Sequence, residues 1–149
     1  MAVKSLSTRI AIIGRGAKCS GGSSAVDRSA YISRTTMYSE YDGTYYYPKY
    51  SEDLVHSEVM LPENAPEEYA DPSVLWNSVE MREKNNSKAQ LTRAYKISIP
   101  NEWSYELATE VVRDYVKRNF VDDGMCVQFA ILLSRILPAP VPCSLFYPK

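Results

Sequence analysis

A tyrosine lies between two arginines in the segment SSAVDRSAYISR, which spans residues 23–34. Tyr31 is three positions from both Arg28 and Arg34, so on a helix both arginines lie about one turn from the tyrosine. A tyrosine in this setting is either a packing residue of the core or a nucleophile that attacks a phosphodiester. In the second case the two guanidinium groups are close enough to hold neighbouring phosphates.

Local sequence signals predict the elements that position Tyr31. The apolar, β-branched run Arg9–Gly14 predicts a strand, and the glycine-rich residues Arg15–Gly22 predict a flexible turn. Ser24 is a suitable N-cap for a helix that begins near Ala25 and continues into the region 37–41. The tyrosine is therefore expected on the first helix of the chain.

Strands and helices alternate through the rest of the pattern. Strands are predicted at 54–61, 94–99 and 125–131, and helices at 71–84 and 102–120. This order indicates a two-layer α/β or α+β domain with helices on one face of the sheet. Of the two classes we predict α+β, with a largely antiparallel sheet, over residues 8–131.

The composition is that of an ordinary globular domain. The chain has 149 residues, of which 45% are hydrophobic, and no apolar run approaches the roughly 20 residues that span a bilayer. No long apolar segment follows the N-terminus, so we expect a cytoplasmic protein without a membrane partner. Cys19, Cys126 and Cys143 are far apart, which argues against a zinc site or a disulfide framework.

Charge and tyrosine content single out two regions. Residues 1–34 hold six basic residues and one acid, whereas residues 35–87 hold eleven acids and three basic residues. Only the basic N-terminal part looks suited to a polyanion, although such an excess also occurs on surfaces without special purpose. Residues 38–50 contain six of the twelve tyrosines, which either stack on the bases of a single strand or pack a polar hairpin onto the domain.

Residues 132–149 depart from the preceding pattern. They are apolar without a clear period, and Pro138, Pro140 and Pro142 stand at alternate positions, which argues against a paired central strand. We therefore expect residues 132–149 to be an aberrant proline-rich tail that does not belong to the preceding pattern.

Six segments occur together in one order: SAVDRSAY at 24–31, VHSEVMLPENAP at 55–66, LWNSVE at 75–80, KAQLTR at 88–93, IPNE at 99–102 and FVDDGMC at 120–126. This combination resembles the N-terminal part of the MobA/MobL (MobQ-type) plasmid mobilisation relaxases. The resemblance implies a protein that nicks one DNA strand at an origin of transfer, where a tyrosine attacks the phosphate and stays on the 5′ end. Three histidines of the family bind Mg²⁺ or Mn²⁺ at that phosphate.

Carried onto this sequence, the resemblance makes Tyr31 the nucleophile. Glu58 matches an acid of the family, for which a supporting role and a plain salt bridge remain open. The expected partners are single-stranded or origin-of-transfer DNA and accessory mobilisation proteins. The residues expected to contact DNA are Arg28, Arg34, Lys88 and Arg93.

The histidines of the family have no counterpart here. The family continues after the strand at 127–131 with a His-Asp start and a Pro-His-Ala-His strand, whereas this chain continues with Leu132-Leu133-Ser134. Set against the family, the tail is expected to result from a frameshift or truncation, or else to be a native variant tail. The missing part would include the metal-bearing central strand, so we expect an incomplete sheet with an exposed apolar edge beside Val127–Ile131 and marginal stability.

His56 is the only histidine, so we expect no metal cofactor in this chain and an inactive relaxase fragment. Two alternatives are a non-catalytic module that binds single-stranded DNA and an interaction protein in which Tyr31 only packs.

Overall fold

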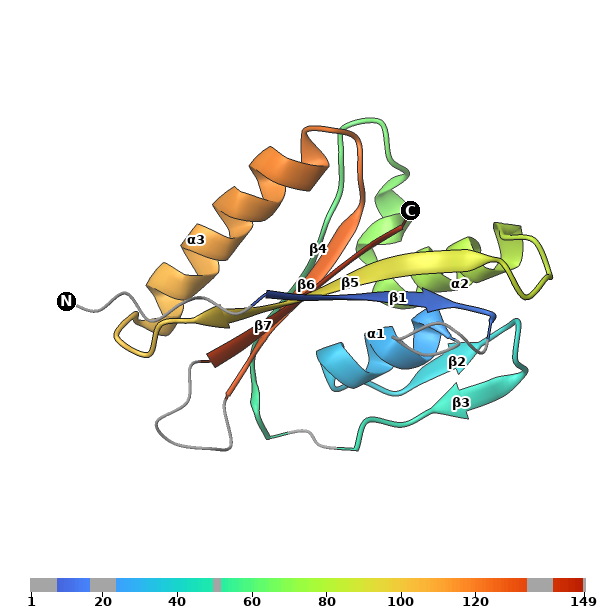
Figure 1. Cartoon of the computed structure of the whole chain (residues 1–149), viewed down its shortest axis with the longest axis horizontal. Helices are drawn as coiled ribbons and strands as arrows, with labels where there is room; N and C mark the ends of the chain where they lie inside the picture. Colours follow the sequence, from blue (N-terminus) through green and yellow to red (C-terminus); the bar gives the residue numbers. More distant parts are fainter. Residues whose placement is uncertain (1–7, 17–23, 50–51, 134–140, 149) are drawn as a thin grey trace.

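A computed structural model describes residues 8–16, 24–49, 52–133 and 141–148, and in them the chain is an α+β protein (Figure 1). Helices α1, α2 and α3 accompany a five-stranded antiparallel sheet and a β2–β3 hairpin. The predicted class and the antiparallel sheet are confirmed. The bounds are β1 Thr8–Gly14, α1 Ala25–Ser33, β2 Met37–Ser39, β3 Thr44–Tyr46, β4 Leu54–Met60, a 3-10 turn Glu67–Ala70, α2 Pro72–Arg82, β5 Gln90–Ile99, α3 Tyr105–Val116, a π turn Lys117–Val121, β6 Val127–Leu132 and β7 Val141–Pro148.

Helix starts follow the local signals in the sequence. The side chain of Ser24 accepts a hydrogen bond from the backbone N–H of Asp27, and Asp71 caps α2 in the same way, with Pro72 at its first position. Helix α1 ends at Ser33, earlier than predicted, because Arg34 adopts the left-handed conformation with φ of 55°. No helix in the described ranges has the length and apolar character needed to cross a membrane.

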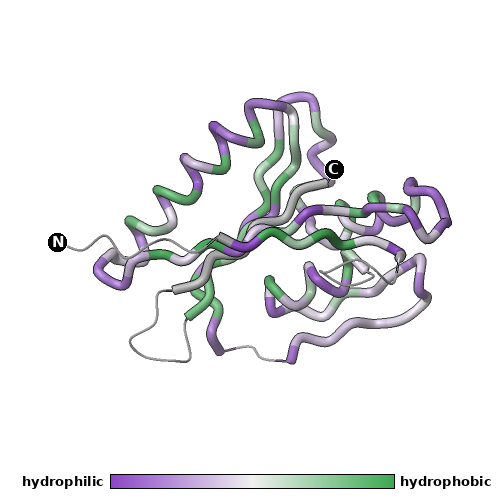
Figure 2. Tube along the Cα trace, viewed as in Figure 1, coloured by the Kyte–Doolittle hydropathy of each residue, from purple (hydrophilic) through white to green (hydrophobic). Residues whose placement is uncertain are grey.

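Helices cover both faces of the sheet, which corrects the expectation of helices on one face. Along β6, Val127, Phe129 and Ile131 join the core cluster beneath α3. The alternate residues Ala130 and Leu132 join the cluster beneath α1 and α2. Because successive strand residues point to opposite faces, α3 lies on one side of the sheet and α1 and α2 lie on the other. Figure 2 shows apolar residues on strands of the sheet, β6 among them, between these layers.

The strand order corrects the prediction for the C-terminal residues. The sheet runs β1-β5-β7-β6-β4, and β7 pairs antiparallel with both β5 and β6. Residues 141–148 are therefore a central strand rather than a tail outside the sheet. Strand β6 is buried along its whole length between β7 and β4, so the expected exposed edge beside it is absent from the described sheet. The frameshift or truncation stays a prediction, and residues 134–140, with Pro138 and Pro140, lie outside the described ranges.

The position of the prolines explains why β7 can be central. Its pairing with β6 extends from Cys143 to Phe146, whereas its pairing with β5 extends from Val141 to Pro148. Pro142 and Pro148 thus fall where β7 has a neighbour on one side only. A proline lacks the N–H that a ladder needs, and at such positions the strand behaves as an edge.

A proline placed inside the two-sided part of β7 should disrupt the sheet. Ser144 pairs with Lys96 on β5 and Ala130 on β6, so Ser144→Pro is expected to lower the free energy of unfolding by about 3 kcal/mol or more. Pro142→Ala is the matched control, with an expected change of about 1 kcal/mol or less. Urea denaturation measures both, and equal midpoints for the two variants would contradict the central position of β7.

Candidate functional site

Tyr31 stands on the exposed side of α1 with a guanidinium group on each side. The residue is 39% exposed, so it is not enclosed in the core. The central guanidinium carbons of Arg28 and Arg34 lie 5.4 and 4.6 Å from the centre of the tyrosine ring. The structure therefore brings these three predicted residues together, at the separation of cation–π contacts.

Arg34 is engaged by the protein itself. Its Nε and Nη2 donate to Oδ1 and Oδ2 of Asp53 at 2.7 and 2.8 Å, and its Nη1 donates to the backbone carbonyl of Tyr31. The Arg34 side chain is only 4% exposed. The hydrogen bond to Asp53 is the main reason that the pKa of Arg34 is raised, against the opposing effect of burial. Its charge is thus largely balanced within the site, and its predicted contact with DNA stays a prediction.

A buried carboxylate holds the other end of α1. Glu80 on α2 is 1% exposed, and its Oε1 accepts from Ser24 Oγ at 2.8 Å and from the backbone N–H groups of Ala25 and Val26 at 2.6 and 3.1 Å. These N–H groups belong to the first turn of α1, where no intrahelical acceptor exists. The negative charge also complements the positive end of the helix dipole. Helix α2 therefore fixes where α1 begins.

A second buried side chain links α1 and α2 to the sheet. Gln128 on β6 is fully buried, and its Oε1 accepts from Ser29 Oγ at 2.7 Å and from Trp76 Nε1 at 2.6 Å. Ser29 lies on α1 and Trp76 on α2. Because the indole N–H only donates, the carbonyl oxygen of Gln128 must face it. The helix that carries Tyr31 is therefore tied to β6 through one amide.

The β2–β3 hairpin carries an exposed aromatic face made by Tyr38, Tyr45 and Tyr47. These residues are 43%, 57% and 73% exposed, and the ring centres of Tyr38 and Tyr45 lie 4.9 Å apart. Asn77 on α2 holds the hairpin, since it accepts from the backbone N–H of Glu40 and donates to the carbonyl of Tyr38. The tyrosine-rich segment thus forms a hairpin that packs on the domain and leaves these three rings exposed, and stacking on bases stays a prediction.

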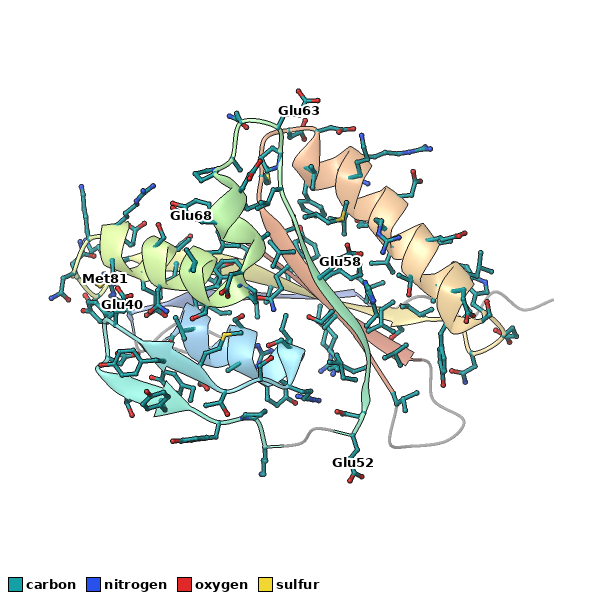
Figure 3. The ribbon with its side chains drawn as sticks, turned by 180° about the vertical axis from the view of Figure 1, so that it is seen from behind. Glu40, Glu52, Glu58, Glu63, Glu68 and Met81 are labelled. Carbon is teal, nitrogen blue, oxygen red and sulfur yellow. The ribbon has the colours of Figure 1, made fainter. Side chains whose placement is uncertain are left out.

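Two other predicted residues lie away from Tyr31. Glu58 on β4 pairs with Phe129, which belongs to the α3 side, and its Oε1 is 2.8 Å from Arg113 Nε and 3.1 Å from His56 Nε2. Figure 3 shows Glu58 beside the long helix α3, well away from Glu40 at the end of the hairpin. Of its two interpretations, the geometry favours the plain salt bridge, because α1 lies on the opposite side of the sheet.

The remaining predicted DNA contacts are also dispersed. Arg93 on β5 alternates with Ala94, which faces the cluster beneath α1, so Arg93 points to the other side of the sheet. Lys88 is exposed in the turn between α2 and β5, where Asn85 accepts a 2.6 Å hydrogen bond from Tyr41. The structure assembles Tyr31, Arg28 and Arg34 but not Arg93 or Glu58.

The residues present do not fit the three-histidine metal site that the resemblance implies. The sequence holds one histidine, His56, which lies on the α3 side of the sheet against Phe129. Within the described ranges no three His, Cys, Asp or Glu side chains are grouped in a way that could hold a metal ion. We therefore assign no metal ligands among the described residues, and the absence of a metal cofactor stays a prediction.

Sequence reasoning missed three residues that shape the site. Asp53 has no local signal, because it is 19 positions from its partner Arg34. Glu80 is the last residue of the LWNSVE motif. The motif supports the family resemblance, but it does not indicate that this acid binds the start of α1. Arg15 donates to the carbonyls of Glu83 and Lys84 at the end of α2, and its guanidinium lies 3.9 Å from the centre of the Tyr41 ring.

The model of the MobA/MobL family matches residues 23–134 of this sequence. The chain belongs to the MobA/MobL family. It is 30% identical over 110 residues to a protein named "Probable mobilization protein MobA" from Bifidobacterium longum, covering 74% of this chain and 19% of that protein. It is 40% identical over 82 residues to "Conjugal transfer protein TraA" from Agrobacterium fabrum, covering 48% of this chain and 7% of that protein.

A solved structure described as "Molecular Basis of Vancomycin Resistance Transfer in Staphylococcus aureus" has the same fold. The TM-score is 0.80 at 20% identity, over 98% of this chain and 70% of that chain. At this identity the likeness concerns the fold alone. This MobA/MobL chain spans about a fifth of the MobA relative and less than a tenth of the TraA relative.

Replacing the buried carboxylate should loosen α1. Glu80→Gln removes the charge that binds the first turn and adds donors at a buried position, so the free energy of unfolding is expected to fall by about 1–3 kcal/mol. Glu110→Gln on the exposed face of α3 is the control, with an expected change within about 0.5 kcal/mol. Chemical denaturation provides the measurement, and a neutral Glu80→Gln would show that this carboxylate does not hold the helix.

Alkaline pH should weaken the attachment of the hairpin through Tyr46. Burial, with a hydrogen bond to Asp42, raises the pKa of Tyr46 to about 12, against about 10 in an unfolded chain. The folded state therefore keeps the proton longer, so this contribution is complete below pH 10 and is lost as pH rises toward 12. Stability should fall less between pH 9 and 11 in Tyr46→Phe than in the wild type, while Tyr47→Phe, at an exposed position, keeps the wild-type dependence.

Proposed function

We propose that this chain is a DNA-binding module of plasmid mobilisation, which holds single-stranded DNA from an origin of transfer along α1. The observation that carries the proposal is the exposed phenol of Tyr31 between the guanidinium groups of Arg28 and Arg34. Membership of the MobA/MobL family and the names of the relatives, a mobilisation protein and conjugal transfer proteins, support it. Accessory mobilisation proteins are further proposed partners.

In this proposal a backbone phosphate lies beside Tyr31, and Arg28 supplies positive charge from the same helix. Arg28 is half-buried on α1, and Asp53 balances the charge of Arg34. In the nicking reaction that the resemblance implies, the Tyr31 oxygen bonds to phosphorus, the bond from phosphorus to the 3′ oxygen breaks, and the 3′ oxygen takes up a proton. A phenol is a poor nucleophile near neutral pH without a base or metal beside it. Because the donor set here does not fit the metal, we propose binding without efficient nicking.

The aromatic face of the hairpin supplies contacts to bases. Tyr45 and Tyr47 leave most of their rings in solvent, and an exposed aromatic ring stacks on any base. The nearby carboxylate of Asp42 accepts a 2.8 Å hydrogen bond from the hydroxyl of Tyr46, so this negative charge is engaged within the hairpin. Stacking adds affinity that depends little on salt, whereas the phosphate contact at Arg28 depends on salt strongly.

Removal of Arg28 should weaken binding and reduce its dependence on salt. Fluorescence anisotropy with a labelled single-stranded oligonucleotide is expected to show severalfold weaker binding by Arg28→Ala, with the slope of log K against log salt smaller by about 0.7. Arg93→Ala removes the same charge on the other side of the sheet and should match the wild type. Equal losses for both variants would indicate unspecific attraction, and no binding by the wild type at low salt would reject the proposal.

Incubation of the protein with an oligonucleotide containing an origin of transfer tests the absence of nicking. We expect no covalent protein–DNA adduct with or without Mn²⁺, and Tyr31→Phe serves as the control. An adduct that requires both Mn²⁺ and Tyr31 would contradict this part of the proposal while supporting the placement of DNA at α1.

A further inference from the structure

We propose that Asp53 is a positioning residue that fixes the ring of Tyr31 through Arg34. The inference rests on the proposed function, in which Tyr31 meets the phosphate of the bound strand. Because both carboxylate oxygens of Asp53 accept hydrogen bonds from Arg34, its proposed effect on the ring passes through the guanidinium group. This gives Arg34 a structural task in place of the phosphate contact expected from the sequence.

The hydrogen bonds of Arg34 leave its guanidinium plane little freedom. Nε and Nη2 bind the two oxygens of Asp53, and Nη1 binds the carbonyl of Tyr31, so the group is held on two sides. A fork of two parallel hydrogen bonds sets direction as well as distance. The guanidinium carbon stays 4.6 Å from the centre of the Tyr31 ring as a result. An exposed tyrosine otherwise changes rotamer within nanoseconds.

Asp53 is itself anchored to the sheet. It directly precedes β4, and its backbone carbonyl accepts a 2.7 Å hydrogen bond from the N–H of Leu133, the residue after β6. The position of the tyrosine ring is therefore fixed relative to the start of β4 and the end of β6 as well as to α1. The left-handed conformation of Arg34 turns its side chain toward Asp53 at the point where α1 stops.

Two substitutions separate the geometry of the fork from its charge. Asp53→Asn keeps the size of the side chain but removes the charge and replaces one acceptor with a donor. Arg34→Lys keeps the positive charge and loses the planar fork. Glu52→Gln, at the exposed neighbour of Asp53, removes the same charge as Asp53→Asn and serves as the matched control. Circular dichroism and thermal denaturation identify variants that remain folded.

The readout is the NMR signal of Tyr31 in protein labelled with ¹³C in its tyrosine rings. Comparison with Tyr31→Phe assigns the signal, without DNA present. We expect Asp53→Asn and Arg34→Lys to shift the Tyr31 signal and to narrow it toward that of a freely rotating ring, whereas Glu52→Gln leaves it unchanged. A residue that only stabilised the fold would lower the melting temperature without moving this signal in the folded protein.

The outcomes distinguish the inference from the proposed function. An unchanged Tyr31 signal in folded Asp53→Asn or Arg34→Lys overturns the positioning role, even if Arg28→Ala still weakens DNA binding. A shifted signal together with DNA binding that ignores Arg28→Ala supports the positioning role and rejects the proposed function. If Asp53→Asn unfolds, the milder Arg34→Lys decides, because it retains the charge opposite Asp53.

Discussion

The position of α1 depends on one buried negative charge. A carboxylate taken out of water is costly unless donors surround it, and Glu80 receives three donors from the start of α1. Neither partner is satisfied without the other, since the N–H groups of the first helical turn also need an acceptor. Gln128 makes a similar buried link, because its carbonyl oxygen on β6 accepts hydrogen bonds from Ser29 on α1 and Trp76 on α2. These buried contacts fix the inner side of α1, and the exposed Tyr31 on the same helix is thereby held in place.

Elements governed by neighbours in sequence could be predicted. Ser24 and Asp71 start helices because their side chains reach N–H groups two or three positions ahead. The pairing of Tyr31 with Arg28 follows from helical spacing in the same way. The end of α1 could not be predicted, because Arg34 is held in the left-handed conformation beside a residue 19 positions away. No local pattern distinguishes this arginine from one that continues a helix.

The structure differs from expectation mainly in the faces and neighbours of the sheet. Glu58 lies on a strand as expected, whereas Arg93 lies on β5 because this strand begins at Gln90, four residues before the predicted start. The side of the sheet that each side chain occupies depends on which face α1 covers. The alternation of residues along a strand shows which of them share a face, but it does not show which helices cover that face. The rule against proline in a central strand holds for Cys143–Phe146, but it does not extend to residues of β7 that have a neighbour on one side only. Partners on both sides become known only when the whole sheet is assembled.

Strand β7 also determines the order in which the domain can fold. In the described sheet, β1 with β5 and β4 with β6 form two antiparallel pairs, and β7 alone joins them. A ribosome delivers residues 141–148 after every other described element, so the two pairs cannot become one sheet until that point. Pairing with β5 closes a loop of more than 40 residues around α3, and such long-range contacts form slowly. Synthesis must therefore pass through an intermediate in which the facing edges of β5 and β6 are open to chaperones or to other chains.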